Sequence, residues 1–310
     1  MIKSAVQNNN RNKWFINFLI IFIFVIAFNC SQSITTNSSL YPLQTLIPIL
    51  PPNDEQKREF DLKTRSEFIT PDESTGIKFS GYKTNNKKFL EEVITPLITP
   101  HLNELRNKSH SEIINVLTLF GYEIYQTYFG KNFYRWGGDI LDLDDPQESS
   151  VRYEYSYGLD CSGFSALPYE LAVHLKLLTP EQALFSSKGF ETYCSKNNLQ
   201  DIGGRDGTSN NFRLDTPELA ELGEVVFHLE KGQVPTEEQI SLLQPGDIVG
   251  RSGHFGIIAF VRGEPYYFES GGWVVPKNDG IPVKAKDALK IFASNGSIMV
   301  RRCLVQNPLE

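Results

Sequence analysis

The spacing of hydrophobic residues changes along the chain. At residues 85–129, apolar side chains recur every three or four positions, which predicts helices, with interruptions near Pro96 and Pro100. Apolar runs typical of strands follow at residues 247–275 and 297–305. Because helices come first and strands that can form hairpins come last, the pattern predicts an α+β fold.

A further helix is predicted near Cys161, because Leu167, Leu171 and Leu175 recur at helical spacing. The exposed amides and positive dipole end of a helix favour an anion, so a cysteine placed there gains thiolate character. Pro168 lacks a backbone donor and predicts a kink or a late start of this helix. Taken alone, a cysteine is more often a buried small hydrophobe, so its neighbours along the chain decide between the two interpretations.

His254 opens an apolar run, residues 254–261, that predicts a strand. A strand in a sheet would hold the imidazole in a rigid position. The other four histidines lie in helical stretches or in the long connection before residue 242, where a surface role is the simpler interpretation. A thiol nucleophile needs an imidazole within hydrogen-bond reach. Cys161 and His254 are therefore the candidate nucleophile and general base.

Three motifs surround these two residues in a fixed order. They are Tyr-x-Trp-Gly-Gly at 134–138, Asp-Cys-Ser-Gly at 160–163, and Leu-x-Pro-Gly-Asp at 243–247 followed by Gly-His-x-Gly at 253–256. Over residues 109–304 the chain resembles the NlpC-type (p-sixty type) papain-like cysteine peptidases. The resemblance implies a papain-like fold, in which N-terminal helices and a nucleophile-bearing helix pack on a mostly antiparallel sheet.

The resemblance also implies a third catalytic residue on the strand after that of His254. The family usually has His there, sometimes Asn or Gln, and Glu269 aligns best with this position. If residues 263–264 form a two-residue turn, Glu269 shares a face of the sheet with His254, and it would orient the imidazole. A one-residue change in loop length would exchange it for Ser270. The alternative role for Glu269 is a surface carboxylate near a turn.

Tyr134, Asp160 and Ser162 match family residues that contact the substrate. The resemblance implies that Tyr134 lies near the nucleophile and that Asp160 and Ser162 bind the free amine of a short peptide. For Asp160 a purely structural role is also open, since Asp caps helices by accepting bonds from their first amides. The backbone amide of Cys161 is a candidate oxyanion donor, because it stands at a helix start.

The four cysteines give no metal motif. No two of them lie in a Cys-x-x-Cys arrangement, so a structural zinc site has little support. We expect no metal or organic cofactor, because water completes acyl-enzyme chemistry. Cys194 and Cys303 are expected to be inert or paired with each other.

The N-terminal 29 residues are typical of an export signal. Three basic residues precede an apolar run at residues 14–28, which is shorter than the ~20 residues of a comfortable membrane-spanning helix. Cys30 follows directly, and this placement resembles a bacterial lipoprotein signal, in which the cysteine carries lipid. Ordinary cleavage nearby and an uncleaved anchor are the alternatives. Residues 30–76 are rich in Ser, Thr, Asn and Pro, which predicts a mostly flexible tether whose short apolar patch at 46–50 could dock on the domain.

Charge argues against nucleic acid as a partner. Without residues 1–29 the chain has 27 basic and 37 acidic residues, and such an acidic body is poorly suited to a phosphate backbone. We therefore expect residues 77–310 to form an exported catalytic domain on a lipid-anchored chain, at the periplasmic or cell-surface side of a bacterial membrane. Insertions at about 139–157 and 178–241 depart from the family pattern, and such segments commonly act as lids or set specificity.

The leading functional hypothesis is a cell-wall cysteine hydrolase that cleaves an amide bond in peptidoglycan stem peptides, the substrate class that the resemblance implies. Two alternatives stay open. An acyl or amide transferase of the same superfamily would use the same residues but exclude water from the acyl-enzyme. A noncatalytic surface lipoprotein would keep the fold as a binding module.

Overall fold

The structure is a computed structural model that describes residues 46–59, 89–130, 133, 159–198, 222–251, 253–270 and 282–305. All of these residues belong to one compact unit, Leu40–Glu310. Cys30, the apolar run at 14–28, Tyr134 and the insertion at 139–157 lie outside the described residues. Within the described ranges, no helix has the length and hydropathy needed to cross a membrane.

The N-terminal part of the described unit is helical, as its spacing predicts. Short pieces precede one long helix: α2 (Asp54–Glu59), η3 (Leu90–Ile94), α4 (Thr95–Ile98), η4 (Thr99–His101), α5 (Leu102–Leu105) and α6 (His110–Phe129). Pro96 and Pro100 lie in the first positions of α4 and η4, where the missing N–H costs nothing. Ser109 and Glu112 form a capping box that starts α6.

The strands form a single antiparallel sheet. They are β1 (Glu224–Leu229), β2 (Ile248–Arg251), β3 (His254–Val261), β4 (Glu264–Phe268), β5 (Val283–Lys284) and β6 (Ile298–Arg302). Their order is β1-β6-β2-β3-β4-β5, and every neighbouring pair is antiparallel. Helices and an antiparallel sheet that are largely separate along the chain make the fold α+β, as predicted.

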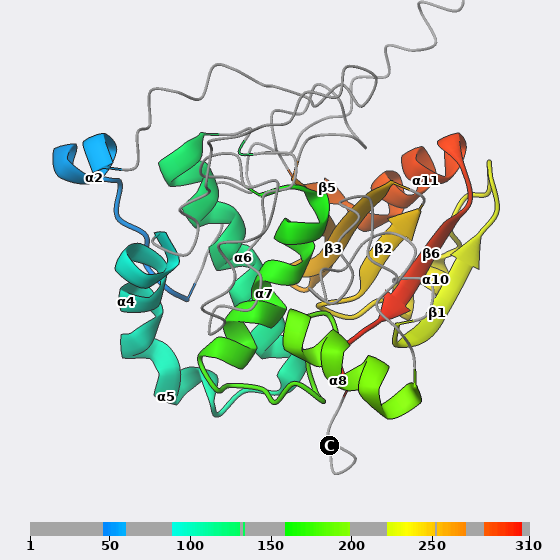
Figure 1. Ribbon diagram of the computed structural model, residues 1–310. Helices are drawn as coiled ribbons and strands as arrows, with labels where there is room; N and C mark the ends of the chain where they lie inside the picture. Colours follow the sequence, from blue (N-terminus) through cyan, green and yellow to red (C-terminus); the bar gives the residue numbers. More distant parts are fainter. Residues whose placement is uncertain are drawn as a thin grey trace, which may run out of the picture. The chain divides into compact units, whose positions relative to one another are not determined.

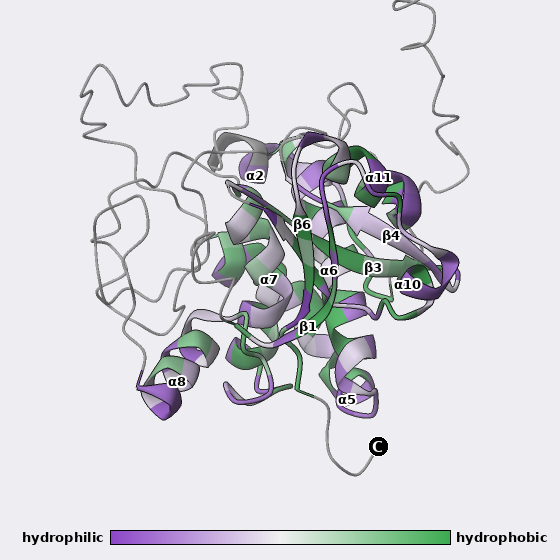
Figure 2. Ribbon diagram, turned by 90° about the vertical axis from the view of Figure 1, so that its right-hand side faces the viewer, coloured by the Kyte–Doolittle hydropathy of each residue, from purple (hydrophilic) through white to green (hydrophobic). Residues whose placement is uncertain are grey.

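Helices cover both faces of this sheet (Figure 1). On one face lie α6 and α7 (Cys161–His174), which pack against each other and against β3. On the other face lies α11 (Ala285–Asn295). Because strand side chains alternate, Ile257 belongs to the core with α6 and α7, and Ile258 belongs to the core with α11. The strand β3 is therefore buried on both sides and hydrophobic along most of its length (Figure 2).

Part of the region 178–241, predicted as an insertion, belongs to the body of the fold. It contains α8 (Ser187–Asn197), the edge strand β1 and α10 (Glu237–Ser241). The strand β1 was not predicted. Because β1 pairs with β6, this part of the region extends the sheet.

The apolar patch at residues 46–50 also packs on the body. Ile47 is fully buried in the core that contains α6 and α7, and Leu46 and Ile49 pack against this core. The Tyr128 hydroxyl of α6 donates to Gln56 Oε1 of α2 at 3.5 Å. Within the stretch expected as a tether, residues 46–49 therefore contact the body.

Candidate active site

The first turn of α7 positions Cys161. Asp160 is the N-cap, and its Oδ1 accepts from the Gly163 amide at 2.7 Å and from Ser162 Oγ at 2.8 Å. The helix begins at Cys161 and continues through Pro168, so the late start predicted from this proline is wrong. Cys161 is half-buried and lies at the end of the helix whose amides favour an anion.

The β3–β4 hairpin sets which residues face His254. Its turn residues are Arg262 and Gly263, with φ of 54° and 82°, as a two-residue type I′ turn requires. The turn predicted at 263–264 is thus wrong by one residue. Because this error moves every partner across the hairpin by two positions, Glu269 stays on the face of the sheet that carries His254.

Glu269 contacts His254 directly. Its Oε2 lies 2.5 Å from His254 Nε2, and both side chains are almost completely buried. Ser270, the other candidate for this role, donates its hydroxyl to the Leu159 carbonyl at 2.6 Å. Ser270 therefore ties the end of β4 to the residue before the N-cap of α7, while Glu269 meets the imidazole.

The imidazole of His254 interacts with both a thiol and a carboxylate. Burial alone would lower the pKa of His254, but hydrogen bonds and charge interactions with Cys161 and Glu269 outweigh it and raise the pKa from 6.5 to about 9. The ring also packs edge-on against Phe292 of α11, with centroids 5.5 Å apart. The protonated imidazole is thus the stabilised form, as a thiolate–imidazolium pair requires.

Stability is expected to fall as pH rises through about 9. The folded-state pKa of His254 is about 9 against 6.5 for an unperturbed histidine, so the folded chain binds more protons between these values. The stabilisation is fully present below pH 6.5 and is lost as the pH rises through about 9. Denaturant unfolding of the wild type at pH 6, 8 and 10 measures it.

The control for this pH dependence is Glu269→Gln. Glutamine keeps the shape of the side chain but cannot hold the negative charge that favours the imidazolium. Its free energy of unfolding should therefore decline less steeply between pH 6 and 10. Equal declines in the two proteins would assign the effect to other groups.

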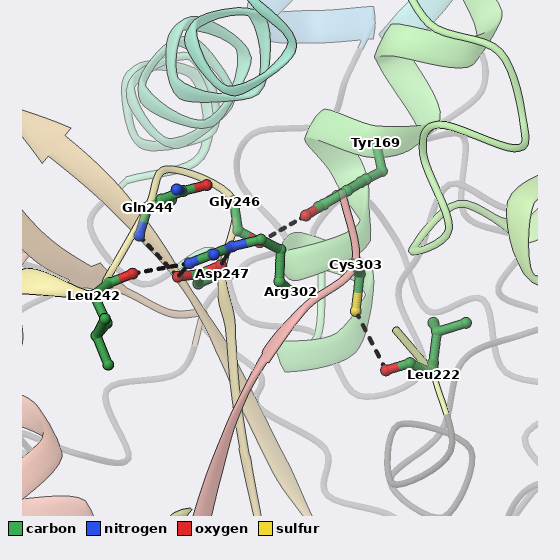
Figure 3. Close-up of polar contacts among 8 residues, drawn as sticks. All are labelled: Tyr169, Leu222, Leu242, Gln244, Gly246, Asp247, Arg302 and Cys303. Atoms are coloured by element: carbon green, nitrogen blue, oxygen red, sulfur yellow. Dashed lines mark hydrogen bonds and ion pairs between the residues drawn. The ribbon is translucent and has the colours of Figure 1, made fainter. Parts of the chain in front are cut away.

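A second buried network holds the Leu-x-Pro-Gly-Asp segment (Figure 3). Asp247 is 1% exposed and accepts two hydrogen bonds from Arg302, from Nε to Oδ1 and from Nη2 to Oδ2, each at 2.9 Å. The Gln244 amide donates to Asp247 Oδ2 at 2.8 Å, and Arg302 Nη2 also donates to the Leu242 carbonyl at 2.9 Å. Burial raises the pKa of Asp247, and the paired guanidinium opposes this effect.

The same segment is tied to the nucleophile helix. Tyr169 of α7 donates its hydroxyl to the Gly246 carbonyl at 2.6 Å, and both groups are buried (Figure 3). Since Gly246 and Asp247 immediately precede β2, this bond connects the helix of Cys161 to the strand paired with that of His254. The motif therefore has a structural role that its spacing alone does not reveal.

Two residues beside His254 and Glu269 were missed in the sequence. Tyr267 donates its hydroxyl to Glu269 Oε2 at 3.2 Å, and Phe292 packs against the imidazole. The alternation of side chains along a strand could have identified Tyr267, because Tyr267 precedes Glu269 by two positions and therefore lies on the same face of the sheet. Phe292 lies on α11, a helix that was not predicted.

The remaining predicted residues have simpler surroundings. Cys303 is a buried free thiol whose Sγ lies 3.9 Å from the Leu222 carbonyl, so it does not pair with Cys194. Burial raises the pKa of Cys303. Within the part of the chain that the structure describes, no three His, Cys, Asp or Glu side chains form a group that could hold a metal ion.

Comparison with known proteins does not place the chain in a family. A scan against protein-family models, a search of curated proteins and a search of solved structures each find no match to the chain. A function for the site therefore has to follow from its residues, its motifs and its geometry.

Proposed function

We propose that the chain is an exported cysteine hydrolase with a papain-like, NlpC-type fold that cleaves an amide bond in peptidoglycan stem peptides. One observation carries the proposal: His254 interacts with Cys161 and, through Nε2, with the buried carboxylate of Glu269. A thiol, an imidazole and an orienting acceptor in this order make up the machinery of nucleophilic acyl transfer. The substrate class comes from the resemblance of the three motifs to the NlpC-type peptidases.

Each of the three residues has a defined part in the proposed reaction. His254 takes the thiol proton, and the Cys161 sulfur attacks the carbonyl carbon of the substrate amide. The imidazolium then gives this proton to the leaving amine as the C–N bond breaks, which leaves a thioester. Water, deprotonated by His254, hydrolyses the thioester and regenerates the thiol. Glu269 accepts a hydrogen bond from the Nε2–H group throughout and keeps the ring in one orientation.

The first turn of α7 can stabilise the negative charge that develops on the substrate carbonyl oxygen. The backbone amide of Cys161 lies in the first turn, where helix amides have no intrahelical acceptor. It is the proposed donor to the oxyanion of the tetrahedral intermediate. Asp160 and Ser162 are proposed to contact the free amine of the peptide, and Tyr134 is proposed to lie near the nucleophile and the substrate. For Asp160 this role would be shared with its capping of α7.

The proposed location is the outer side of a bacterial membrane. Cys30 would carry the lipid, and residues between it and the buried patch at Ile47 would link the anchor to the body. Such a tether would leave the hydrolase free to reach wall peptides near the membrane.

The test compares the chain from Leu40 onward with its Cys161→Ala variant. This start keeps Ile47 in the core. Purified stem peptides are incubated with each protein and read by mass spectrometry, with Cys194→Ala as the matched control because Cys194 is a buried cysteine away from His254. New fragments should appear with the wild type and the control and be absent with Cys161→Ala. Intact peptides with every protein, together with no alkylation of Cys161, would refute the hydrolase.

Two other outcomes separate the alternatives. Conjugates with an added amine in place of free acids would identify a transferase, because the amine then replaces water at the acyl-enzyme. Alkylation of Cys161 without cleavage would mean that the nucleophile is active on a different substrate.

A further inference from the structure

We infer that Tyr267 is a positioning residue of this site: its hydroxyl holds the Glu269 carboxylate against His254. The inference rests on the proposed function, since it assigns to Tyr267 the task of keeping a catalytic base oriented. Tyr267 does not meet the reacting atoms. It acts through Glu269, and its role can be measured without knowing the substrate.

Two donors converge on one carboxylate oxygen. Glu269 Oε2 lies 2.5 Å from His254 Nε2 and 3.2 Å from the Tyr267 hydroxyl. An ionised carboxylate only accepts hydrogen bonds, so the phenol and the imidazole both donate to it. A glutamate side chain has three rotatable bonds, and a second donor restricts them. With the Tyr267 bond in place, the carboxylate stays where the imidazole can reach it.

The ring of Tyr267 is itself fixed by packing. It is 2% exposed and lies over Gly256, where a Cβ atom would be only 2.2 Å from the ring. Any residue other than glycine at position 256 would therefore displace the ring. Phe292 of α11 also packs against this ring, with centroids 6.0 Å apart. The hydroxyl is thus aimed by a rigid aromatic ring on a central strand pair.

Charge around the ring keeps the hydroxyl a donor. Burial, together with the neighbouring Glu269 carboxylate, raises the pKa of Tyr267 well above its ordinary value, so the phenol stays protonated. The titratable and charged groups that face this cluster among the described residues come from three elements: Cys161 on α7, Arg251 on β2 and His254 on β3. The helix α11 contributes the neutral Phe292, over which the Arg251 guanidinium lies at 5.0 Å.

The test replaces Tyr267 by phenylalanine in the full chain. This change removes the hydroxyl and keeps the ring. The matched control is Tyr266→Phe, which removes the hydroxyl of the next tyrosine, on the opposite face of β4. The first measurement is the rate of Cys161 alkylation by iodoacetamide from pH 4 to 10, assigned to Cys161 by peptide mapping. The second is kcat and KM for stem-peptide cleavage, and thermal unfolding checks the fold.

With Tyr267→Phe, the pH at which Cys161 becomes reactive should rise by about half a unit or more, because a less well held Glu269 stabilises the imidazolium less. The kcat should fall roughly tenfold with KM little changed, the size expected for one lost hydrogen bond to a charged group. Tyr266→Phe should change neither quantity.

An onset of alkylation that is unchanged or moves to lower pH would overturn the inference, since Glu269 would then hold His254 without the hydroxyl. The inference would also be overturned if the pH profile of Cys161 alkylation in the wild type gave no sign of a thiolate–imidazolium pair. Failure of the proposed function looks different: the alkylation shift would still appear while no peptide is cleaved.

Discussion

Replacing Cys161 by alanine, His254 by glutamine, or both together is expected to lower hydrolysis to the same residual rate, about 10³-fold or more below the wild type. The thiol attacks only when the imidazole has taken its proton, and without the thiol no acyl-enzyme forms for the imidazole to hydrolyse. The two residues act as one unit, so removing the second should cost almost nothing once the first is gone. Glutamine at 254 keeps a donor for the buried Glu269 carboxylate and limits the loss of stability.

Rates with saturating stem peptide measure this effect, and thermal unfolding shows which variants keep the fold. His228→Gln is the matched control, because His228 is exposed on the edge strand β1 beside Glu230. It should keep wild-type activity. Losses that multiply in the double variant, or a His254→Gln protein with a tenth of the wild-type rate, would mean that the thiol is activated by some other group.

The elements around the candidate site could be predicted because their signals are local. The leucines of α7 and the apolar run of β3 identify a helix that begins at Cys161 and a strand that begins at His254. The face of Glu269 was also predicted correctly, although the turn was placed one residue too late. Strand side chains alternate with a period of two, so a two-position error in pairing changes no face.

What the sequence did not predict depends on contacts between distant segments. The strand β1 lies at the edge of the sheet and is only partly buried, so its side chains do not alternate cleanly, and its partner β6 lies near the other end of the chain. The helix α11 is an exception: its buried residues, three alanines with Leu289 and Phe292, recur at helical spacing, so a local signal was present in the sequence and was overlooked. Ile47 lies in a proline-rich stretch whose composition suggests a tether, and only its burial reveals the contact.

The largest loss of stability is expected from Asp247→Ala. This change leaves the Arg302 guanidinium beside an empty buried site and frees the Gln244 amide. Removing one partner of a buried ion pair typically lowers the free energy of unfolding by about 3–5 kcal/mol, because the other charge remains uncompensated. Denaturant unfolding at pH 7 measures the loss, and a value below about 1 kcal/mol would contradict a buried, paired carboxylate.

A double variant distinguishes the loss of the ion pair from the cost of leaving one buried charge without its partner. In Asp247→Ala with Arg302→Met, neither charge remains, so the loss should be smaller than the sum of the two single losses. The control is Glu237→Gln, which breaks the exposed ion pair of Glu237 with Lys286. Exposed pairs contribute about 0–1 kcal/mol, so this variant should unfold nearly as the wild type does.

The Asp247 network also bears on the distance between the proposed nucleophile and base. Gly246 and Asp247 lie just before β2, the Gly246 carbonyl accepts from Tyr169 of α7, and β2 pairs with β3. A loosened start of β2 would therefore let Cys161 and His254 drift apart. An error of about 1 Å in catalytic geometry can cost on the order of 10²-fold in rate. Asp247→Ala should accordingly lose hydrolysis at temperatures where it is still folded, whereas Glu237→Gln should not.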